Sequence, residues 1–311
     1  MSRLTVTLPD ARVLEEVRRL GVPGDVEIGV WDLTAPLDGR GRVDLVVVPN
    51  TFGGREGFRV LDDLPGLRVV QLSSAGYEHA LPYLRAGLVL CNGRGVHDAG
   101  TAELALGLTL AAQRGIGDAV RSMPAGRWAP EPRSSLADRR VLVLGYGSVG
   151  AAIGRRLEAF ETDVVRVASA AREAPEGHVH GIDELMTLLP DVDILISVLP
   201  LTDATQGLID AALLAALPDG ALVVNVGRGK VVDTQALLAE LQAGRLRAAL
   251  DVTDPEPLPA EHPLWRAPNT IITPHVGGYT DATTPRLAAL VRRQVGALVD
   301  GREPENVVAR T

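Results

Sequence analysis

The sequence predicts an α/β protein with two consecutive units, each built around a parallel β-sheet. Short apolar runs alternate with helical patterns along most of the chain. A glycine-rich turn joins an apolar run to a helical pattern within residues 141–160. The length of 311 residues allows about two domains, each with a sizeable core.

The first hundred residues contain short, continuous apolar runs, which are typical of parallel strands buried on both faces. Ala11–Leu20 has helical periodicity and predicts a connecting helix. The predicted strands are Leu4–Leu8, Val26–Trp31, Val43–Val48, Leu67–Leu72 and Leu88–Cys91.

A second series of six predicted strands begins near residue 139, with helical segments between them, and would complete a doubly wound parallel sheet. Two long Ala/Leu-rich helices are predicted at Gly100–Arg121 and Ala282–Val299. Met123–Leu136 has three prolines and predicts a loop that could pack on a neighbouring subunit. The six strands are Val141–Leu144, Val164–Ala168, Ile194–Val198, Ala221–Val226, Leu246–Val252 and Thr270–Thr273.

The glycine-rich turn after the first of these six strands is the pattern of a dinucleotide-binding Rossmann sheet. Gly145 would form the tight turn, Gly147 would let a pyrophosphate approach the backbone, and Gly150 would let the helix pack on the strand. The anion then meets the helix N-terminus. The candidate cofactor-binding residues in this turn are Gly145, Tyr146, Gly147, Ser148, Val149 and Gly150.

The end of the next strand indicates which dinucleotide binds. Ala168 stands where NAD-binding sheets usually carry a carboxylate for the ribose, and Ser169 and Arg172 follow it. A hydroxyl and a guanidinium suit a 2′-phosphate, so we expect NADP to be preferred over NAD. The alternative is that Ser169 and Arg172 are ordinary surface residues and that Glu173 binds the ribose of NAD.

Later strand ends supply the candidate chemical groups, because ligands of such sheets lie at the carboxyl edge. Leu199 and Pro200, at a strand end that leads to the predicted start of a helix, would line the nicotinamide side. Arg228 follows an apolar strand and stands between two glycines, where it could bind an anionic substrate bidentately. Asp251 and His275 follow the last two strands, so a carboxylate and an imidazole could converge there.

Composition excludes several other classes of protein. The net charge is −8, without a basic run, which argues against nucleic-acid binding. No apolar stretch is long enough for a membrane span, and the N-terminus lacks a signal-peptide pattern. Cys91 is the single cysteine, so the chain has no internal disulfide, and we expect a cytoplasmic protein with small-molecule partners.

We expect no metal site. His178 and His180 alternate along the chain, but the sequence places no adjacent carboxylate or cysteine that would complete a ligand set. Of the six histidines, only His275 follows a predicted strand at the carboxyl edge.

Five motifs, in this order, resemble those of the D-isomer-specific 2-hydroxyacid dehydrogenase family, and the resemblance spans nearly the whole chain. They are the glycine motif Gly145–Gly150, Pro200-Leu201-Thr202, the Asn-x-x-Arg-Gly of residues 225–229, the Asp-Val-x-x-x-Glu-Pro of residues 251–257, and Thr273-Pro274-His275.

The resemblance implies specific roles. Arg228 would bind the carboxylate and carbonyl of a 2-oxo acid, His275 would be the general acid, and Glu256 would orient the imidazole. Asp251 would hold the carboxamide of the cofactor. The other residues implied are Val226, Gly227, Gly277 and Gly278 around the cofactor, and Ser74, Ala75 and Gly76 in a substrate loop whose backbone amides meet the carboxylate.

The family's fold implies a discontinuous, flavodoxin-like substrate domain, residues 1–98 and 282–311, and a dinucleotide-binding domain, residues 99–281. It also implies a homodimer. The resulting hypothesis is an NADP-preferring oxidoreductase, with NAD as the alternative cofactor, that reduces glyoxylate, hydroxypyruvate or a similar 2-oxo acid. A dinucleotide-sensing, corepressor-like protein and a formate- or phosphite-type dehydrogenase remain alternatives.

The chain also departs from the family pattern. Ala168 replaces the usual aspartate, and this puts NAD use in doubt. Gly227 and Lys230 stand at positions that are more often small or alanine-like. Tyr77-Glu78 stands where Val-Asp is common, which puts the usual substrates in doubt.

Overall fold

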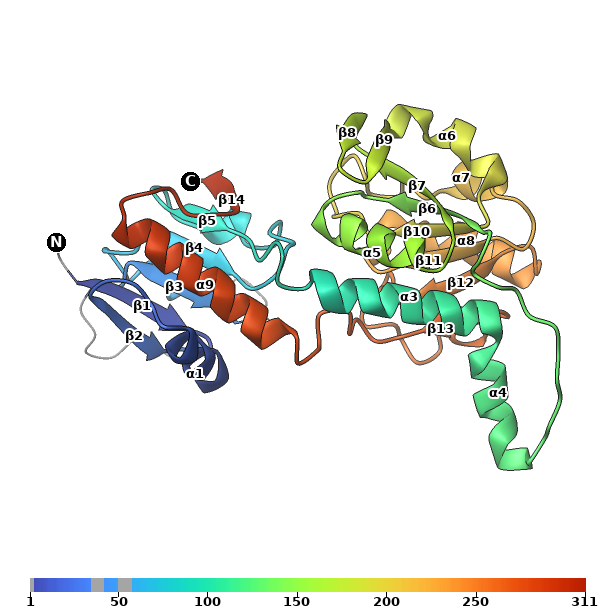
Figure 1. Cartoon of the computed structure of the whole chain (residues 1–311), viewed down its shortest axis with the longest axis horizontal. Coiled ribbons are helices and arrows are strands. Elements are labelled where there is room, and N and C mark those ends of the chain that lie inside the picture. The colour runs from blue at the N-terminus through green and yellow to red at the C-terminus, as the bar shows by residue number, and fades with distance from the viewer. Residues whose placement is uncertain (1–2, 35–41, 50–57) are drawn as a thin grey trace. The chain divides into compact units, whose positions relative to one another are not determined.

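The computed structural model describes residues 3–34, 42–49 and 58–311, and the chain divides into two units (Figure 1). Unit 1 comprises Met1–His97 and Thr280–Thr311, and unit 2 comprises Asp98–Tyr279. Each unit has its own sheet with helices packed on it, so the predicted α/β class is confirmed.

The sheet of unit 1 has the strand order β14-β5-β4-β3-β1-β2. Its first five strands pair in parallel in the order 2-1-3-4-5, which is the flavodoxin-like order, and β14 pairs with β5 antiparallel. The strands are β1 (Leu4–Leu8), β2 (Val26–Val30), β3 (Leu45–Val48), β4 (Val69–Leu72), β5 (Val89–Cys91) and β14 (Val307–Arg310).

Both faces of this sheet are covered, because successive strand residues point to opposite sides. Val47 packs with helices α1 (Ala11–Leu20) and α9 (Thr283–Val299) on one face, whereas Val46 packs on the other face with Phe58. Figure 1 shows α9, the red helix from the end of the chain, lying across this sheet. The C-terminal segment thus completes the core that the N-terminal segment begins.

Two features of unit 1 differ from the sequence prediction. Strand β2 lies at the edge of the sheet and is only partly buried, so it is not covered on both faces. Strand β14 has no counterpart among the predicted strands. Its short Val-Val run is paired because the end of the chain returns to the free edge of β5.

Unit 2 has a sheet with the order β13-β12-β11-β10-β6-β7-β9-β8. The strands β7 to β9 lie on one side of β6, and β10 to β13 lie on the other. This order defines a doubly wound sheet with its switch point between β6 and β10. The strands are β6 (Arg140–Leu144), β7 (Asp163–Ala168), β8 (Arg172–Ala174), β9 (Gly177–Gly181), β10 (Ile194–Ser197), β11 (Leu222–Asn225), β12 (Arg247–Leu250) and β13 (Thr270–Ile272).

Helices cover both faces of this sheet as well. Val143 of β6 packs with α3 and α5, and Leu142 packs with the helices of the opposite face. None of the described helices combines the length and the apolar character that a membrane crossing needs. The helices of unit 2 are α3 (Asp98–Arg114), α4 (Ile116–Ser122), α5 (Ser148–Glu158), α6 (Leu185–Leu188), α7 (Ala211–Ala216) and α8 (Thr234–Gln242).

Three predictions for unit 2 need correction. The predicted helix Gly100–Arg121 is broken at Gly115, whose φ of 62° ends α3 and starts α4 in a new direction. The six predicted strands are present, but an additional hairpin, β8–β9, follows β7. The chain after Pro200 forms a turn closed by Thr205, which accepts from the Thr202 N–H at 2.8 Å, and not the start of a helix.

Candidate active site

The glycine turn after β6 has the geometry that its sequence predicts. Gly145 has a φ of 104°, which favours glycine, and the N–H groups of Gly145 and Tyr146 both donate to the Val167 carbonyl at 2.9 Å. A Cβ at Gly150 would lie 2.4 Å from the Gly145 carbonyl oxygen, so only glycine lets α5 approach the turn. Both glycines are therefore required for packing.

Gly147 is different, because space around it is open. A Cβ built there would meet no atom within 4 Å, although Gly147 is the N-cap residue of α5. No side chain caps this helix end, so its first N–H groups face outward at the positive end of the helix dipole. This is the arrangement that a pyrophosphate needs, and the residues present fit a dinucleotide.

The side chain of Tyr146 faces the core and not the cofactor side. It is 2% exposed, and its hydroxyl accepts from Arg166 Nε at 3.2 Å. Val149 also packs against the core. Of the six residues of the turn, Tyr146 and Val149 can therefore serve a cofactor only through the backbone.

Arg172 reaches back from β8 to this turn. Its Nη2 donates to the carbonyl oxygen of Tyr146 at 2.5 Å, which holds the guanidinium beside the glycine turn. Neighbouring residues of a strand point to opposite faces, and the next residue, Glu173, bonds to His178 at 2.7 Å instead. Ser169 is exposed at the end of β7. The structure thus places Arg172 beside the glycine turn and directs Glu173 elsewhere.

The loops after β10 and β11 approach each other closely at the carboxyl edge. A Cβ at Gly227 would lie 2.6 Å from the Leu199 carbonyl oxygen, so Gly227 permits this approach. Leu199 and Val226 are buried, whereas Pro200 is exposed. These residues form a backbone wall beside the glycine turn, since a Cβ at Gly145 would lie 3.1 Å from the Val198 carbonyl oxygen.

Arg228 follows β11 in an extended conformation, with φ −138° and ψ 139°. Asn225, which is 1% exposed, holds this turn from both sides. Its Nδ2 donates to the Arg228 carbonyl at 3.0 Å, and its Oδ1 accepts from the Gly227 N–H at 3.0 Å. The Arg228 Nη1 donates to the Gly227 carbonyl at 2.8 Å. Backbone and guanidinium are therefore both fixed at the sheet edge.

His275 and Glu256, which are 19 residues apart in sequence, form a close pair. The Nδ1 of His275 lies 2.5 Å from Glu256 Oε1. An ionised carboxylate only accepts hydrogen bonds, so Nδ1 carries the proton of this bond, and Nε2 is the nitrogen that faces away from Glu256. The His275 backbone has a φ of 52°, in the left-handed region that non-glycine residues rarely adopt. This pair can hold and transfer a proton.

Asp251 holds the loop that carries His275. Its carboxylate is 2% exposed and accepts from the Thr273 hydroxyl at 2.6 Å and from the N–H groups of Val276 and Gly277, both at 2.9 Å. Its backbone carbonyl accepts from the His275 N–H at 2.8 Å. Asp251 therefore positions the histidine, whatever it contributes to a cofactor.

The sequence analysis assigned no role to Asn225 or Thr273, which are the partners that support Arg228 and Asp251. A polar residue at the last buried position of an apolar strand is the signal that could have identified Asn225. Thr273 gives no comparable signal, because its partner is 22 residues away in sequence.

The predicted substrate loop belongs to unit 1. The carbonyl oxygens of Ser74 and Ala75 accept from the Gly93 N–H at 2.6 Å and from Asn92 Nδ2 at 2.7 Å. Within the described part of the chain, the N–H groups of Ala75 and Gly76 have no protein acceptor. The loop is thus anchored through its carbonyls and presents two free amides.

The expectation about His178 and His180 is wrong in one respect. Two carboxylates do accompany these histidines, Glu173 at 2.7 Å from His178 and Glu184 at 2.8 Å from His180. The antiparallel pairing of β8 with β9 brings Glu173 opposite His178, which the spacing in sequence did not indicate.

A doubly wound sheet with an open glycine turn, and an arginine and an imidazole–carboxylate pair at the same edge, define a nicotinamide-dinucleotide-dependent oxidoreductase. The chain belongs to the D-isomer specific 2-hydroxyacid dehydrogenase family, whose NAD-binding-domain model matches residues 106–277. A curated relative, glyoxylate/hydroxypyruvate reductase B of Yersinia enterocolitica, is 33% identical over 272 residues, 82% of each chain.

Solved structures agree with this assignment. A family member from Aeromonas salmonicida is 27% identical with a TM-score of 0.85 and covers 99% of each chain. An NADPH-dependent glyoxylate/hydroxypyruvate reductase from Sinorhizobium meliloti, in complex with NADP and malonate, is 30% identical with a TM-score of 0.76, covering 99% of this chain and 97% of that one.

Proposed function

We propose that this protein reduces a small 2-oxo acid, of the glyoxylate or hydroxypyruvate class, to the D-2-hydroxy acid with NADPH. The observation that carries the proposal is the 2.5 Å bond between His275 Nδ1 and Glu256, at the sheet edge that also presents Arg228. The glyoxylate/hydroxypyruvate reductases among the relatives support the substrate class.

A nicotinamide dinucleotide held at the glycine turn would supply the hydride for the carbonyl carbon. Arg228 binds the carboxylate and the carbonyl oxygen of the substrate, because a guanidinium offers two parallel donors to such an acid. Protonated His275 donates its Nε2 proton to the carbonyl oxygen as negative charge develops there. Glu256 keeps the ring oriented and stabilises its charged form.

NADPH preference rests on residues 168–172. Ala168 brings no carboxylate that would repel a 2′-phosphate, and the Arg172 guanidinium is held beside the glycine turn. Glu173, the alternative ribose ligand, bonds to His178. These contacts favour a phosphate clamp built from Arg172 with Ser169.

A homodimer is the assembly that fits the exposed apolar side chains of unit 2. We define the α4 arm as residues 116–135, which project from the body of unit 2 (Figure 1). Trp128 is 95% exposed, Met123 73% and Val120 57%. Large apolar residues grouped in this way are typical of an interface, and closed two-fold dimers are the commonest assembly.

The direct test is kinetic. Purified protein is mixed with NADPH and, in turn, glyoxylate, hydroxypyruvate and pyruvate, and the loss of nicotinamide absorbance is followed. His275→Gln should lower kcat by about 10²- to 10⁴-fold, the usual contribution of general acid catalysis. His262→Gln is the control and should leave kcat unchanged, because His262 only caps the short helix Pro263–Arg266. Absence of turnover with every acid and both dinucleotides would refute the proposal.

A further inference from the structure

The β8–β9 hairpin carries a cluster of metal-ligating side chains that the proposed reaction does not use. His178 and His180 lie on β9, and Glu184 ends the short helix that follows it, residues Ile182–Glu184. One ligand atom from each of these three lies within 4.8 Å of the others. Among residues 3–34, 42–49 and 58–311, no other group of three such side chains is as close.

Strand geometry explains why the two imidazoles meet. Residues two apart on a strand point to the same face, so His178 and His180 share a face while Val179, fully buried, faces the core. Their ring centroids are 4.7 Å apart, with the rings nearly perpendicular.

A carboxylate bonds to one nitrogen of each ring. The Nδ1 of His178 is bonded to Glu173 at 2.7 Å, and the Nδ1 of His180 to Glu184 at 2.8 Å. Because a carboxylate only accepts, each Nδ1 carries the proton of its bond. An ion bound to His178 is held by Nε2, whereas an ion shared by His180 and Glu184 replaces the proton between them. A carboxylate that holds the second nitrogen of a metal-ligating histidine, as Glu173 holds that of His178, is typical of metal sites.

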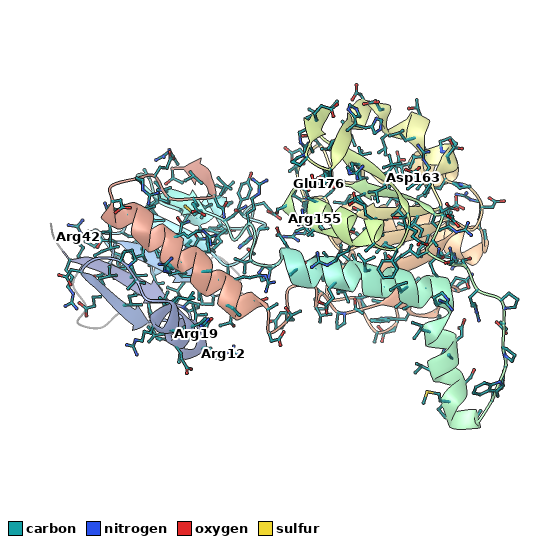
Figure 2. All side chains as sticks on the ribbon, in the orientation of Figure 1. Arg12, Arg19, Arg42, Arg155, Asp163 and Glu176 are labelled. Atoms are coloured by element: carbon teal, nitrogen blue, oxygen red, sulfur yellow. The ribbon has the colours of Figure 1, made fainter. Side chains whose placement is uncertain are left out.

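The framework of the cluster is also fixed. Glu184 Oε1 accepts from the Gly181 N–H at 3.0 Å, which holds the carboxylate over the end of β9. Arg155 of α5 pairs with Glu176 in the hairpin turn at 3.3 Å, and Figure 2 shows the two side chains together. The hairpin is thus tied to α5.

We propose that His178, His180 and Glu184 bind one divalent transition-metal ion such as Zn²⁺ or Ni²⁺. Two imidazoles and a carboxylate suit these ions, whereas Mg²⁺ and Ca²⁺ prefer oxygen ligands. Tetrahedral zinc with bonds of about 2.1 Å needs ligand atoms roughly 3.4 Å apart. The side chains are 48%, 29% and 41% exposed, so they can rotate to close the remaining distance, and water completes the coordination.

The role that follows is structural. The ion links β9 to the helix turn after it, and β9 pairs with β8, the strand that carries Arg172. Occupancy therefore stabilises the hairpin without adding a group to the His275 site. This inference does not depend on the proposed substrate or on the NADPH preference.

Calorimetric titration of the untagged full chain with zinc chloride tests the proposal. Wild type should bind one ion, and His178→Gln or His180→Gln should lower the affinity at least tenfold, because each removes one ligand. His275→Gln should bind zinc like wild type, since it removes an imidazole–carboxylate pair that lies outside the cluster. Magnesium chloride should give no binding. Circular dichroism confirms that each variant is folded.

The thermal midpoint gives a second readout. Zinc should raise the midpoint of wild type and of His275→Gln, and should not raise that of His180→Gln. Absence of saturable zinc binding to wild type would overturn the proposal. So would binding that survives both His178→Gln and His180→Gln, or binding that is lost in His275→Gln, because the ion would then lie elsewhere.

Discussion

The backbone N–H of His275 donates to the backbone carbonyl of Asp251 at 2.8 Å, and the Asp251 carboxylate fixes the loop on both sides of that histidine. The buried Asp251 thus determines the position of the His275 imidazole. The imidazole in turn meets Glu256, which follows the same strand, β12, as Asp251. Two carboxylates after one strand therefore position one histidine from the neighbouring strand.

Asp251→Asn should lower kcat between about tenfold and a hundredfold, because an amide accepts through one oxygen only and the His275 loop shifts. We expect kcat to fall more than KM rises, which a purely structural residue would not produce. Asp210→Asn is the matched control, since asparagine caps a helix as well as aspartate does. Steady-state kinetics measure kcat and KM of both variants. Equal losses of kcat in the two variants would contradict a positioning role for Asp251.

Gly147→Ala should impair dinucleotide binding, whereas Gly150→Ala should impair folding stability. Alanine at position 147 meets no protein atom but occupies the space open to a phosphate, so dinucleotide affinity should fall by about tenfold or more while stability is kept. Alanine at position 150 would press on the Gly145 carbonyl and should cost about 1–3 kcal/mol of folding stability. Fluorescence titration with NADPH and urea unfolding measure the two effects, and a stable, tightly binding Gly147→Ala would count against the pyrophosphate site.

Arg172→Ala should weaken NADPH selectively. Loss of one charge-assisted clamp on a 2′-phosphate corresponds to about 1.5–3 kcal/mol, which is roughly 10- to 150-fold in kcat/KM for NADPH. The value for NADH should change little. Arg302→Ala, which removes an exposed arginine paired with Asp300, is the control for a general change in charge. Equal losses with both cofactors would reject the clamp.

Trp128→Glu should convert the proposed dimer into a monomer, because it puts a charge in the centre of an apolar interface. Sedimentation velocity of wild type and variant measures the change. Trp265→Glu is the control, since Trp265 is half exposed but lies outside the α4 arm. A wild-type monomer, or a dimer unaffected by Trp128→Glu, would rule out this interface.

Cys91 should resist alkylation in the folded protein. Burial raises the pKa of its thiol to about 12 from an ordinary 9.0, so near pH 8 the folded chain has about 10³-fold less thiolate than the unfolded chain. The rate with a thiol reagent should rise by a similar factor in denaturant. The neutral thiol's contribution to stability is complete below pH 9 and is lost as the pH rises toward 12. Rapid labelling of the folded protein at pH 8 would contradict this burial.

The strands were predictable wherever their residues were continuous and apolar. The β6 run Val-Leu-Val-Leu and the glycines after it specify strand, turn and helix locally. The steric requirement for glycine there comes from residues that are close in sequence. By contrast, β8 (Arg-Glu-Ala) and β14 (Val-Val-Ala-Arg) are too short to contain a long apolar run, and they are strands because a neighbouring strand edge pairs with them. The break at Gly115 depends on one positive φ that helical periodicity does not reveal.

The sequence by itself determined the order of the chemical groups, the dinucleotide-binding turn and the family, since each depends on residue type at short spacing. Only the tertiary structure decided which of those groups meet. Parallel strands brought Glu256 to His275 across 19 residues and Thr273 to Asp251 across 22. The antiparallel return of β9 brought Glu173 to His178 and turned it away from the cofactor turn that Arg172 reaches. The distances between side chains depend on which strands pair and on the path of the loops between them, and the local sequence determines neither.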